Sequence, residues 1–486
     1  MKEHALPSEI EIKLDLSNEA LETLIGSDIL GEPREVLRQH SIYFDTADRK
    51  LKQEGFSLRI RHTGDARVQT VKATGPAKSL FSRSEWETPI ESDEPVLDLT
   101  SPLRSEFGAD LEVDSLFEVL VERRAFDLEE NRSKLEAVVD QGEVVSGCRQ
   151  TLVRELEIEL KDGGARDLFV FARKIDAVAP FRFGVLSKSE RGYLLQDKEP
   201  FAHKAERLLL EHSVRPLAAF RTIAASCFRQ FRLNEDILLG RRNPEALHQA
   251  RVASRRLRSA FSLFKDILPG DVPARLQDEL RWIAGVLGHA RNVDVLLAKA
   301  KDADLRWKLK AVRKSTYDDA VDALESSRAR AVMLDFNEWL YCSDFDKIAD
   351  QAKAETAAEF AGKALERMRR KLKKHGQALA DVDDEHRHQV RKDAKKLRYA
   401  AEFFASLFDD KRGARRYRKF TAAMEEMQDH LGELNDLVTG PDVLKQHGLS
   451  GHPAENTVLS HADKADLIAK AQDSIDEVLD TKRFWR

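Results

Sequence analysis

The chain has 486 residues, with 80 Lys and Arg against 85 Asp and Glu and a formal net charge of -5. A hydrophobic content of 42% excludes a disordered chain, and no apolar run is long enough to span a membrane. The three cysteines lie far apart, which argues against a disulfide framework and a zinc site. We therefore expect a soluble cytoplasmic protein without a signal peptide, long enough for roughly three domains.

The charge is unevenly distributed along the chain. Residues 1–200 carry 28 Lys and Arg against 40 Asp and Glu, a net charge of -12, and residues 201–486 carry 52 against 45, a net charge of +7. Apolar residues alternate with polar residues along short runs of the first region, which predicts an antiparallel sheet or barrel. These runs are 9–16, 56–62, 67–73, 84–91, 134–145 and 154–161.

The second region has long stretches with a period of 3.6 residues, which predict a helical bundle. These stretches are 205–233, 245–267, 274–300, 306–332, 345–380, 384–409, 413–438 and 461–480. The chain is therefore expected to be an α+β multidomain protein.

Charged residues occupy alternate positions in several of the predicted strands, so they share one face of each strand. A single strand of this kind usually presents a solvated outer face, but several together favour a closed sheet with a polar lumen. The charged sets are Glu9, Glu11 and Lys13; Glu155, Glu157 and Glu159; Arg59 and Arg61; and Arg83, Glu85 and Glu87.

The residue types of this lumen indicate its ligand. Clustered carboxylates are hard oxygen ligands suited to Mg²⁺ or Mn²⁺. Arg and Lys side chains facing them would neutralise phosphate oxygens, and no glycine-rich phosphate loop is present. We expect a polyanion such as a triphosphate with its metal ion. The candidate cations are Lys13, Arg59, Arg61, Lys72, Arg83, Arg123, Lys188 and Arg191.

An ordered series of motifs resembles the CYTH superfamily, the triphosphate tunnel metalloenzymes. The first is Glu9-Ile-Glu11-Ile-Lys13, which resembles the E-x-E-x-K signature. The others are Tyr43-Phe44-Asp45-Thr46, Leu58-Arg59-Ile60-Arg61, Gln69-Thr70-Val71-Lys72, Arg83-Ser84-Glu85-Trp86-Glu87, Asp140-Gln141-Gly142, Glu155-Leu-Glu157-Ile-Glu159-Leu and Ser187-Lys188-Ser189-Glu190-Arg191-Gly192-Tyr193.

The resemblance implies an eight-stranded antiparallel tunnel domain over 5–203, whose known activities include inorganic triphosphatase, thiamine triphosphatase and adenylate cyclase. It implies that Lys13, with Arg59, Arg61, Lys72, Arg83, Arg123, Lys188 and Arg191, grips the triphosphate. Arg123 is preferred to Arg124, although either residue can be the inward one. Catalysis is assigned to Lys13 and to four metal ligands, Glu9, Glu11, Glu157 and Glu159, with Glu155 and Asp140 as further ligands of Mg²⁺ or Mn²⁺.

An internal repeat marks the second region, where the sequence from His248 to Arg258 recurs from His388 to Arg398 at an offset of 140 residues. A basic helix face is usually solvated surface, but its repetition with a histidine in register favours a groove for a polyanion. The histidines would add charge beside phosphate if they were protonated. The residues that share a face are His248, Arg251, Arg255 and Arg258 in one copy and His388, Arg391, Lys395 and Arg398 in the other.

This repeat resembles the CHAD domain over 213–486, and the likeness extends to Leu287–Asp294 and Leu431–Asp436. The resemblance implies two four-helix repeats, roughly 213–345 and 346–486, around a basic channel with affinity for inorganic polyphosphate. Nucleic acid ranks below polyphosphate because the region has no recognisable reading motif.

The interpretation of the whole chain is a metal-dependent enzyme that hydrolyses inorganic triphosphate to phosphate and pyrophosphate, joined to a polyphosphate-binding domain. The alternatives are an adenylate cyclase or other nucleoside or thiamine triphosphatase, and a polyphosphate-binding scaffold with weak catalysis. No membrane partner is expected.

Overall fold

The computed structural model describes residues 10–73, 84–97, 102–108, 110–197, 200–343, 345, 355–459 and 463–486. The chain forms two compact units. The first contains residues 1–201 together with 330–343, and the second contains residues 202–329 and 344–486. A segment from the middle of the helical region therefore belongs to the unit that contains the sheet.

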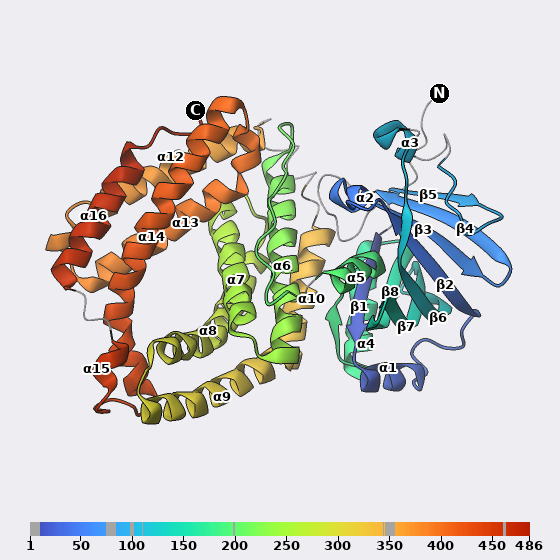
Figure 1. The fold of residues 1–486 in the computed structure, drawn as a ribbon, viewed down its shortest axis with the longest axis horizontal. Coiled ribbons are helices and arrows are strands. Elements are labelled where there is room, and N and C mark those ends of the chain that lie inside the picture. Colours follow the sequence, from blue (N-terminus) through green and yellow to red (C-terminus); the bar gives the residue numbers. More distant parts are fainter. Residues whose placement is uncertain are drawn as a thin grey trace. The chain divides into compact units, whose positions relative to one another are not determined.

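The first unit contains one antiparallel sheet (Figure 1). Its nine strands have the order β5-β4-β3-β2-β6-β7-β8-β1-β9. The strands are β1 (Ile10–Leu16), β2 (Glu35–Asp45), β3 (Phe56–Thr63), β4 (Ala66–Ala73), β5 (Ser84–Pro89), β6 (Asp114–Glu130), β7 (Ser133–Ser146), β8 (Arg149–Asp162) and β9 (Phe181–Phe183).

The predicted closed barrel of eight strands is wrong in two respects. The sheet has nine strands, and no pairing between β5 and β9 joins its two edges within the described residues. The extra strand β9 has three residues, too few for a recognisable alternation, and it pairs with the end of β1 at Leu14–Leu16. The strands β2 and β6 are not among the predicted runs. In β2 four polar residues follow one another at 38–41, and β6 mixes the apolar run Val119–Val121 with charges on both faces.

Apolar side chains cover one face of the sheet, and helices pack on it. Ile12, Leu14, Leu156 and Ile158 are at most 1% exposed, and α4 contacts β1, β6 and β8. Burial of this face leaves the alternate, charged residues on the other side of the same strands. The helices of the unit are α1 (Asn18–Ile25), α2 (Lys50–Gln53), α3 (Pro102–Phe107), α4 (Ala165–Val178) and α5 (Lys188–Gln196).

The helix α10 (Ser327–Cys342) attaches to the first unit through ion pairs with α4. Arg330 Nε lies 2.5 Å from Asp176 Oδ1, and an Arg173 Nη2 lies 2.7 Å from Asp335 Oδ1 and from Glu338 Oε2. These contacts explain why residues 330–343 group with the sheet.

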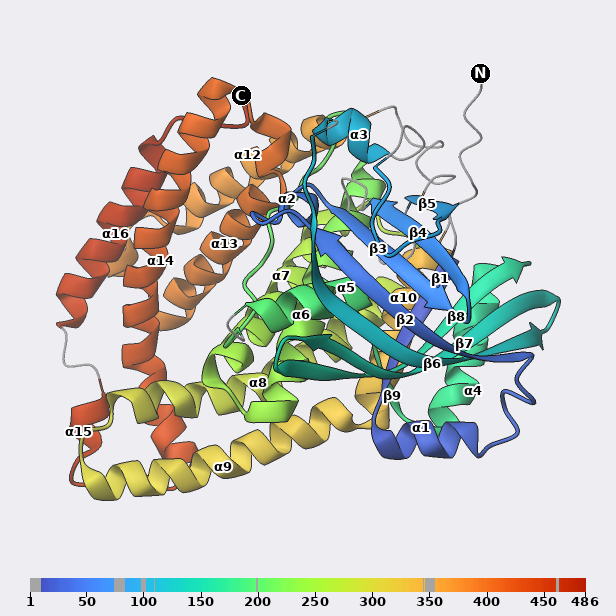
Figure 2. The same cartoon turned by 45° about the vertical axis from the view of Figure 1, so that its right-hand side comes forward.

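The second unit is helical (Figure 2). In it α12 packs on α13, α13 on α14, and α14 on α16, while α6 packs on α7 and α8 on α9. The helices are α6 (Pro216–Arg241), α7 (Pro244–Phe264), α8 (Val272–Lys299), α9 (Ala303–Glu325), α12 (Ala357–His375), α13 (Asp384–Phe403), α14 (Lys411–Gln446), α15 (Glu455–Val458) and α16 (Lys464–Asp480).

Two of the predicted helical stretches differ from the observed helices for local reasons. Helix α6 begins at Pro216 and not near residue 205, since a proline is favoured in the first turn and disfavours helix before it. The stretch 306–332 is divided at Ser326, which is extended with φ -66° and ψ 152° and ends α9. Among the described residues, no helix combines the length and the apolar character that crossing a bilayer requires.

Candidate active site and anion-binding groove

The strand register brings the predicted charged residues onto one surface, which we call the charged face. Asp140 of β7 lies opposite Arg123 of β6 and opposite Glu155 of β8. Asp15 of β1 lies opposite Glu155, and Lys13 lies opposite Glu157. Since directly opposed residues project to the same side of a sheet, these charges form adjacent rows across four strands.

Helix α5 packs against β6, β7 and β8 and brings two further cations to the charged face, Lys188 and Arg191. Its close approach requires Gly192, because a Cβ there would lie 2.1 Å from the ring of Phe117. A capping box of Ser187 and Glu190 begins the helix. The motif around Lys188 therefore positions α5 against the sheet and also supplies positive charge to the charged face.

Asp45 anchors α5 from the neighbouring strand β2. Its side chain is fully buried and accepts a hydrogen bond of 2.7 Å from the Tyr193 hydroxyl. It also accepts from the backbone N–H groups of Leu51, at 2.8 Å, and Lys52, at 3.0 Å. This network gives the Tyr43–Thr46 motif a positioning role.

Lys188 lies inside a group of three carboxylates. Its Nζ is 2.7 Å from Asp140 Oδ2 and 3.4 Å from Glu157 Oε1, and it also contacts Glu155 Oε1. Lys13 reaches the same group, with Nζ 2.5 Å from Glu157 Oε1 and 3.4 Å from Glu155 Oε1. The two lysines neutralise a carboxylate cluster that would otherwise be buried without compensation.

Arg123 closes the cluster from β6. It donates to both oxygens of Asp140, from Nε at 2.8 Å and from an Nη2 at 2.6 Å, and lies 3.6 Å from Glu157 Oε2. Arg191 pairs with Asp15 at 2.7 Å and lies 3.7 Å from Glu155 Oε2. Every carboxylate of the group therefore has a cation within ion-pair distance.

The pKa values follow from this pairing. Burial disfavours the charged form of Lys188, but Asp140, Glu155 and Glu157 outweigh burial and raise its pKa above 10.5. Burial likewise opposes ionisation of Glu157, and the charges of Lys13, Lys188 and Arg123 hold its pKa well below 4.5. The pKa of Asp140 is also lowered, by Lys188 and Arg123 against the effect of burial. Lys188, Glu157 and Asp140 are therefore ionised at neutral pH.

The carboxylate cluster fits a divalent cation. Oxygens of Asp140, Glu155 and Glu157 lie within 4.8 Å of one another, and three hard oxygen donors suit Mg²⁺ or Mn²⁺. Glu155 Oε2 is buried and accepts no hydrogen bond from a described residue, which leaves a ligand atom available.

The cluster overlaps only partly with the predicted ligand set. Glu157 belongs to it, together with Glu155 and Asp140. Glu11 lies opposite Glu159, two residues further along β1 and β8 from the pair Lys13 and Glu157, and Glu159 pairs with Lys161 at 2.7 Å. Glu9 lies outside the described residues.

The remaining predicted phosphate ligands lie further along the charged face. Arg59 donates from Nη1 to the Tyr43 hydroxyl at 3.4 Å, and Lys72 pairs with Glu85 at 2.6 Å. The Nε groups of Arg59 and Arg61 are buried without an acceptor among the described residues. Arg83 lies outside the described residues.

The sequence left open whether Arg123 or Arg124 faces inward, and the structure has Arg123 on the charged face. Arg124 projects to the other side of β6 and pairs with Glu122. Asp15 was not among the predicted residues, although it continues the alternation of Glu11 and Lys13. Tyr43 was identified only as part of a motif, and its contact with Arg59 was not predicted.

The second unit has a different electrostatic centre, formed where the repeated helices α7 and α13 contact each other. We call it the basic groove and define it by Arg251, Arg255, Arg391 and Lys395. Arg251 donates to the Gly288 carbonyl at 3.5 Å and Arg391 to the Gly432 carbonyl at 3.2 Å. The two copies of the repeat therefore hold their arginines against equivalent glycines.

Cations face cations in the basic groove. Burial, together with Arg255, Arg391 and Arg251, lowers the pKa of Lys395 to about 6. Burial and the neighbours Arg255, Arg291 and Arg391 lower the pKa of Arg251 to about 10. Asp436 offsets part of this charge at Arg391 and Lys395, and the positive charge that remains in excess favours an anionic ligand.

The other predicted groove residues behave differently. Burial and Arg291 lower the pKa of His248 to about 4, and burial also lowers the pKa of His388, so neither histidine adds positive charge at neutral pH in the free protein. Burial, Arg281 and Arg255 lower the pKa of Arg258. Arg398 pairs with Glu402 at 2.9 Å.

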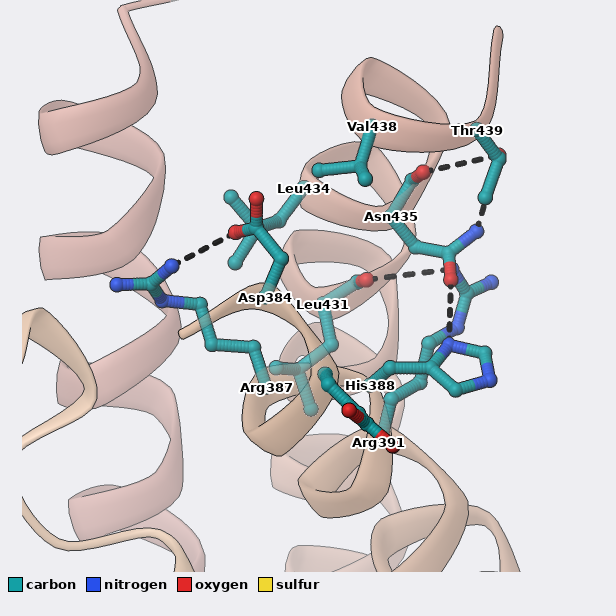
Figure 3. Close-up of a pocket in the computed structure, with 10 residues that line it drawn as sticks. Asp384, Arg387, His388, Arg391, Leu431, Leu434, Asn435, Val438 and Thr439 are labelled. Carbon is teal, nitrogen blue, oxygen red and sulfur yellow. Dashed lines mark hydrogen bonds and ion pairs between the residues drawn. The ribbon is translucent and has the colours of Figure 1, made fainter. Parts of the chain in front are cut away.

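A cavity of about 290 Å³ lies beside the basic groove in the second repeat (Figure 3). His388 and Arg391 line it together with the apolar residues Leu431, Leu434 and Val438. His388 Nδ1 lies 2.9 Å from Asn435 Oδ1, so a hydrogen bond to a neutral side chain holds the ring in place.

Comparisons with known proteins agree with this division. The model of the CYTH domain matches residues 7–193, and the model of the CHAD domain matches residues 222–445. An inorganic triphosphatase of Haemophilus influenzae is 30% identical over 206 residues, which cover 40% of this chain and 57% of the relative. An uncharacterized protein of Mycobacterium tuberculosis is 26% identical over 372 residues, 67% of this chain and 64% of the relative.

The chain thus spans less than two thirds of the length of either of these relatives. Among solved structures, the crystal structure of the CHAD domain from the plant Ricinus communis is similar at 30% identity and a TM-score of 0.49. The match covers 58% of this chain and 97% of that domain.

Proposed function

Because this chain is a CYTH–CHAD protein, with a CYTH domain followed by a CHAD domain, we propose that it hydrolyses inorganic triphosphate to phosphate and pyrophosphate with Mg²⁺ or Mn²⁺ and binds inorganic polyphosphate through its helical domain. One observation supports the enzymatic part most strongly. A buried carboxylate cluster and the side chains of Lys13, Lys188 and Arg123 meet at one point of the charged face.

The charged face offers what triphosphate hydrolysis requires. Asp140, Glu155 and Glu157 would hold the metal ion, which when bound neutralises phosphate charge and lowers the pKa of water. Lys13 and Lys188 are ionised and close to these carboxylates, so a phosphate chain beside the metal would offer them further acceptors.

The buried Nε groups of Arg59 and Arg61 would bind the outer part of the chain. These donors would stabilise the charge that develops on the leaving pyrophosphate as water adds to the terminal phosphorus. The proposed reaction uses carboxylates to hold the metal ion and Lys and Arg side chains to bind phosphate. It needs no serine, cysteine or histidine nucleophile.

Turnover of competing substrates tests the enzymatic proposal. The full chain is incubated with Mg²⁺ or Mn²⁺ and tripolyphosphate, ATP or thiamine triphosphate, and release of phosphate and cyclic AMP is measured. We expect fastest phosphate release from tripolyphosphate and none without metal. Cyclic AMP formation or a preference for ATP or thiamine triphosphate would favour one of the other activities, and no turnover of any substrate would favour a binding scaffold.

The neighbouring arginines Arg123 and Arg124 provide a matched pair of variants. We expect Arg123→Ala to lower kcat/KM for tripolyphosphate about 100-fold, since it removes a charged donor beside the phosphates and releases Asp140. Arg124→Ala should change kcat/KM less than threefold, because its partner is Glu122 on the other side of the sheet. Equal losses in both variants would contradict the assignment of the charged face.

The like-charge groups of the basic groove support the polyphosphate part of the proposal. We expect Arg251→Ala combined with Arg391→Ala to weaken binding of long-chain polyphosphate by at least tenfold. Lys373→Ala combined with Lys374→Ala removes two exposed lysines of α12 as a control and should have a small effect. Equal losses in the two double variants would indicate attraction to overall charge and contradict a groove.

A further inference from the structure

The helical unit contains a second basic cavity, whose Arg291 lies near His248 and Arg251 of the shared face of the repeats. The cavity has a volume of about 790 Å³ and lies between the beginning of α7, the end of α8 and the helix α9. We call it the α9 cavity. Two acids, Glu245 and Asp294, oppose six cations, so its lining has a formal charge of +4. The cations are Arg242, Arg291, Arg306, Lys310, Arg313 and Lys314.

The amphipathic pattern of α9 creates this concentration of charge. Leu305 and Leu309 are at most 1% exposed and pack in a core with residues of α8 and α14. Arg306, Lys310 and Arg313 recur at intervals of four and three residues, so they share one helix face. Burial of the leucines therefore fixes the direction in which the basic face points.

Part of the cavity wall is held rigidly. Asp294, which is 7% exposed, accepts 2.7 Å hydrogen bonds from Arg313 Nε and from the Tyr317 hydroxyl. The Arg313 guanidinium also lies 4.0 Å from the centre of the Tyr317 ring. Arg306 donates to the carbonyls of Leu297, at 3.2 Å, and Ala300, at 2.7 Å. Two guanidinium groups are thus oriented before any ligand arrives.

Other cations of the α9 cavity have no protein partner. Arg291, Lys310 and Lys314 form no hydrogen bond or ion pair with any residue in the described part of the chain. Unpaired basic side chains that line one cavity create a local positive potential, which favours an anion.

The second repeat shows that this charge is not a general property of the fold. The cavity of Figure 3 occupies the equivalent place, because it is lined by Glu385, which is offset from Glu245 by 140 residues. On the following helix, alignment of the equivalent glycines Gly288 and Gly432 puts Asn435 in the place of Arg291 and Val438 in the place of Asp294. In that cavity the acids Asp384 and Glu385 balance Arg387 and Arg391.

We propose that the α9 cavity binds a phosphoanhydride anion, either inorganic pyrophosphate or the diphosphate group of a nucleotide. The excess of cations over acids in the lining complements such a group, and the oriented guanidinium groups of Arg306 and Arg313 suit contact with phosphate oxygens. This site is independent of the activity proposed for the charged face. Arg291 also lies close to Arg251 of the basic groove, whereas Lys310 and Lys314 belong to the α9 cavity alone.

The test removes those two lysines. Pyrophosphate is titrated into the full chain with EDTA, which prevents metal-dependent turnover, and binding is followed by calorimetry and by amide hydrogen exchange over 303–317. We expect Lys310→Ala combined with Lys314→Ala to weaken binding at this site at least tenfold and to abolish the protection of 303–317. The matched control, Lys301→Ala combined with Lys308→Ala, removes two lysines from the same part of the chain outside the cavity and should leave both readouts unchanged.

Further arms identify the site and its ligand. Pyrophosphate should still protect 303–317 in the Arg251→Ala, Arg391→Ala variant, in which the basic groove is impaired. If pyrophosphate and a nucleoside diphosphate protect 303–317 at similar concentrations, the cavity recognises the phosphates alone. If the nucleoside diphosphate binds more tightly, the ligand is a nucleotide. Pyrophosphate binding that leaves 303–317 unprotected, or equal losses in the two lysine variants, would overturn the proposal.

Discussion

The two units handle clustered positive charge in opposite ways. On the charged face each lysine of the cluster is paired with carboxylates, and the pKa values of Lys13 and Lys188 are raised. In the basic groove Lys395 faces arginines, and its pKa is lowered to about 6. The difference indicates two kinds of ligand. A neutralised cluster can accept a cation and an anion together, whereas a groove with an excess of cations favours an anion.

The largest expected effect comes from removing the buried lysine of the charged face. Lys188→Met would leave Asp140, Glu155 and Glu157 with less compensation, so we expect the free energy of unfolding to fall by about 3–5 kcal/mol without metal. Tripolyphosphate turnover should fall by a factor of about 100 or more. Chemical denaturation and a phosphate-release assay measure these losses.

Added Mn²⁺ sharpens the same prediction. Because a divalent ion supplies positive charge to the same carboxylates, it should raise the Tm of Lys188→Met more than that of the unmodified chain. Lys134→Met, which alters an exposed lysine of β7, serves as the control and should change the Tm little. If Lys188→Met were as stable as this control, the carboxylate cluster would not depend on Lys188.

In the basic groove, replacement of a lysine by methionine should raise the free energy of unfolding instead of lowering it. Lys395→Met removes a buried amine whose charged form its surroundings disfavour, so we expect the free energy of unfolding to rise by about 1 kcal/mol, while affinity for long-chain polyphosphate falls. Denaturation and a polyphosphate-binding assay on the same preparation test both parts. Lys392→Met, an exposed neighbour on α13, is the control. A loss of stability in Lys395→Met would contradict the proposed difference between the lysines of the two units.

A further expected effect is a pH dependence of the groove. With a pKa of about 6 in the folded chain against an ordinary value of 10.5, Lys395 binds fewer protons when folded than when unfolded between these two values. Its contribution to stability therefore becomes more favourable as pH rises through this window, by up to about 1.4 kcal/mol per pH unit.

Polyphosphate reverses the effect by favouring the charged lysine. Binding at pH 7.5 should take up as much as one proton, which is measured from the dependence of the calorimetric enthalpy on the ionisation enthalpy of the buffer. Lys395→Met should lose most of this uptake. The same uptake in the variant would assign the proton to another group.

Local sequence patterns predicted much of both sites. Alternation in 9–16 and 154–161 predicted that Lys13 shares a face with Glu11 on one strand and Glu157 a face with Glu155 on another, and the 140-residue repeat identified α7 and α13. Alternation did not predict the open nine-stranded sheet, because β9 is too short for a periodic signal and β2 and β6 carry mixed patterns. It also gave no reason to prefer Asp140 and Glu155 over Glu9 and Glu11 as partners of Glu157.

The sequence by itself determined which face of each strand and helix is charged, because that depends only on the period of the local backbone. The tertiary structure decided which charges meet. Strand register brings Asp140 beside Glu155, the docking of α5 through Gly192 and Tyr193 carries Lys188 into the carboxylates, and the packing of α7 on α13 brings Arg255 close to Lys395. These encounters join residues far apart in the chain, so only the packing of the whole unit fixes whether a cation faces an acid or another cation.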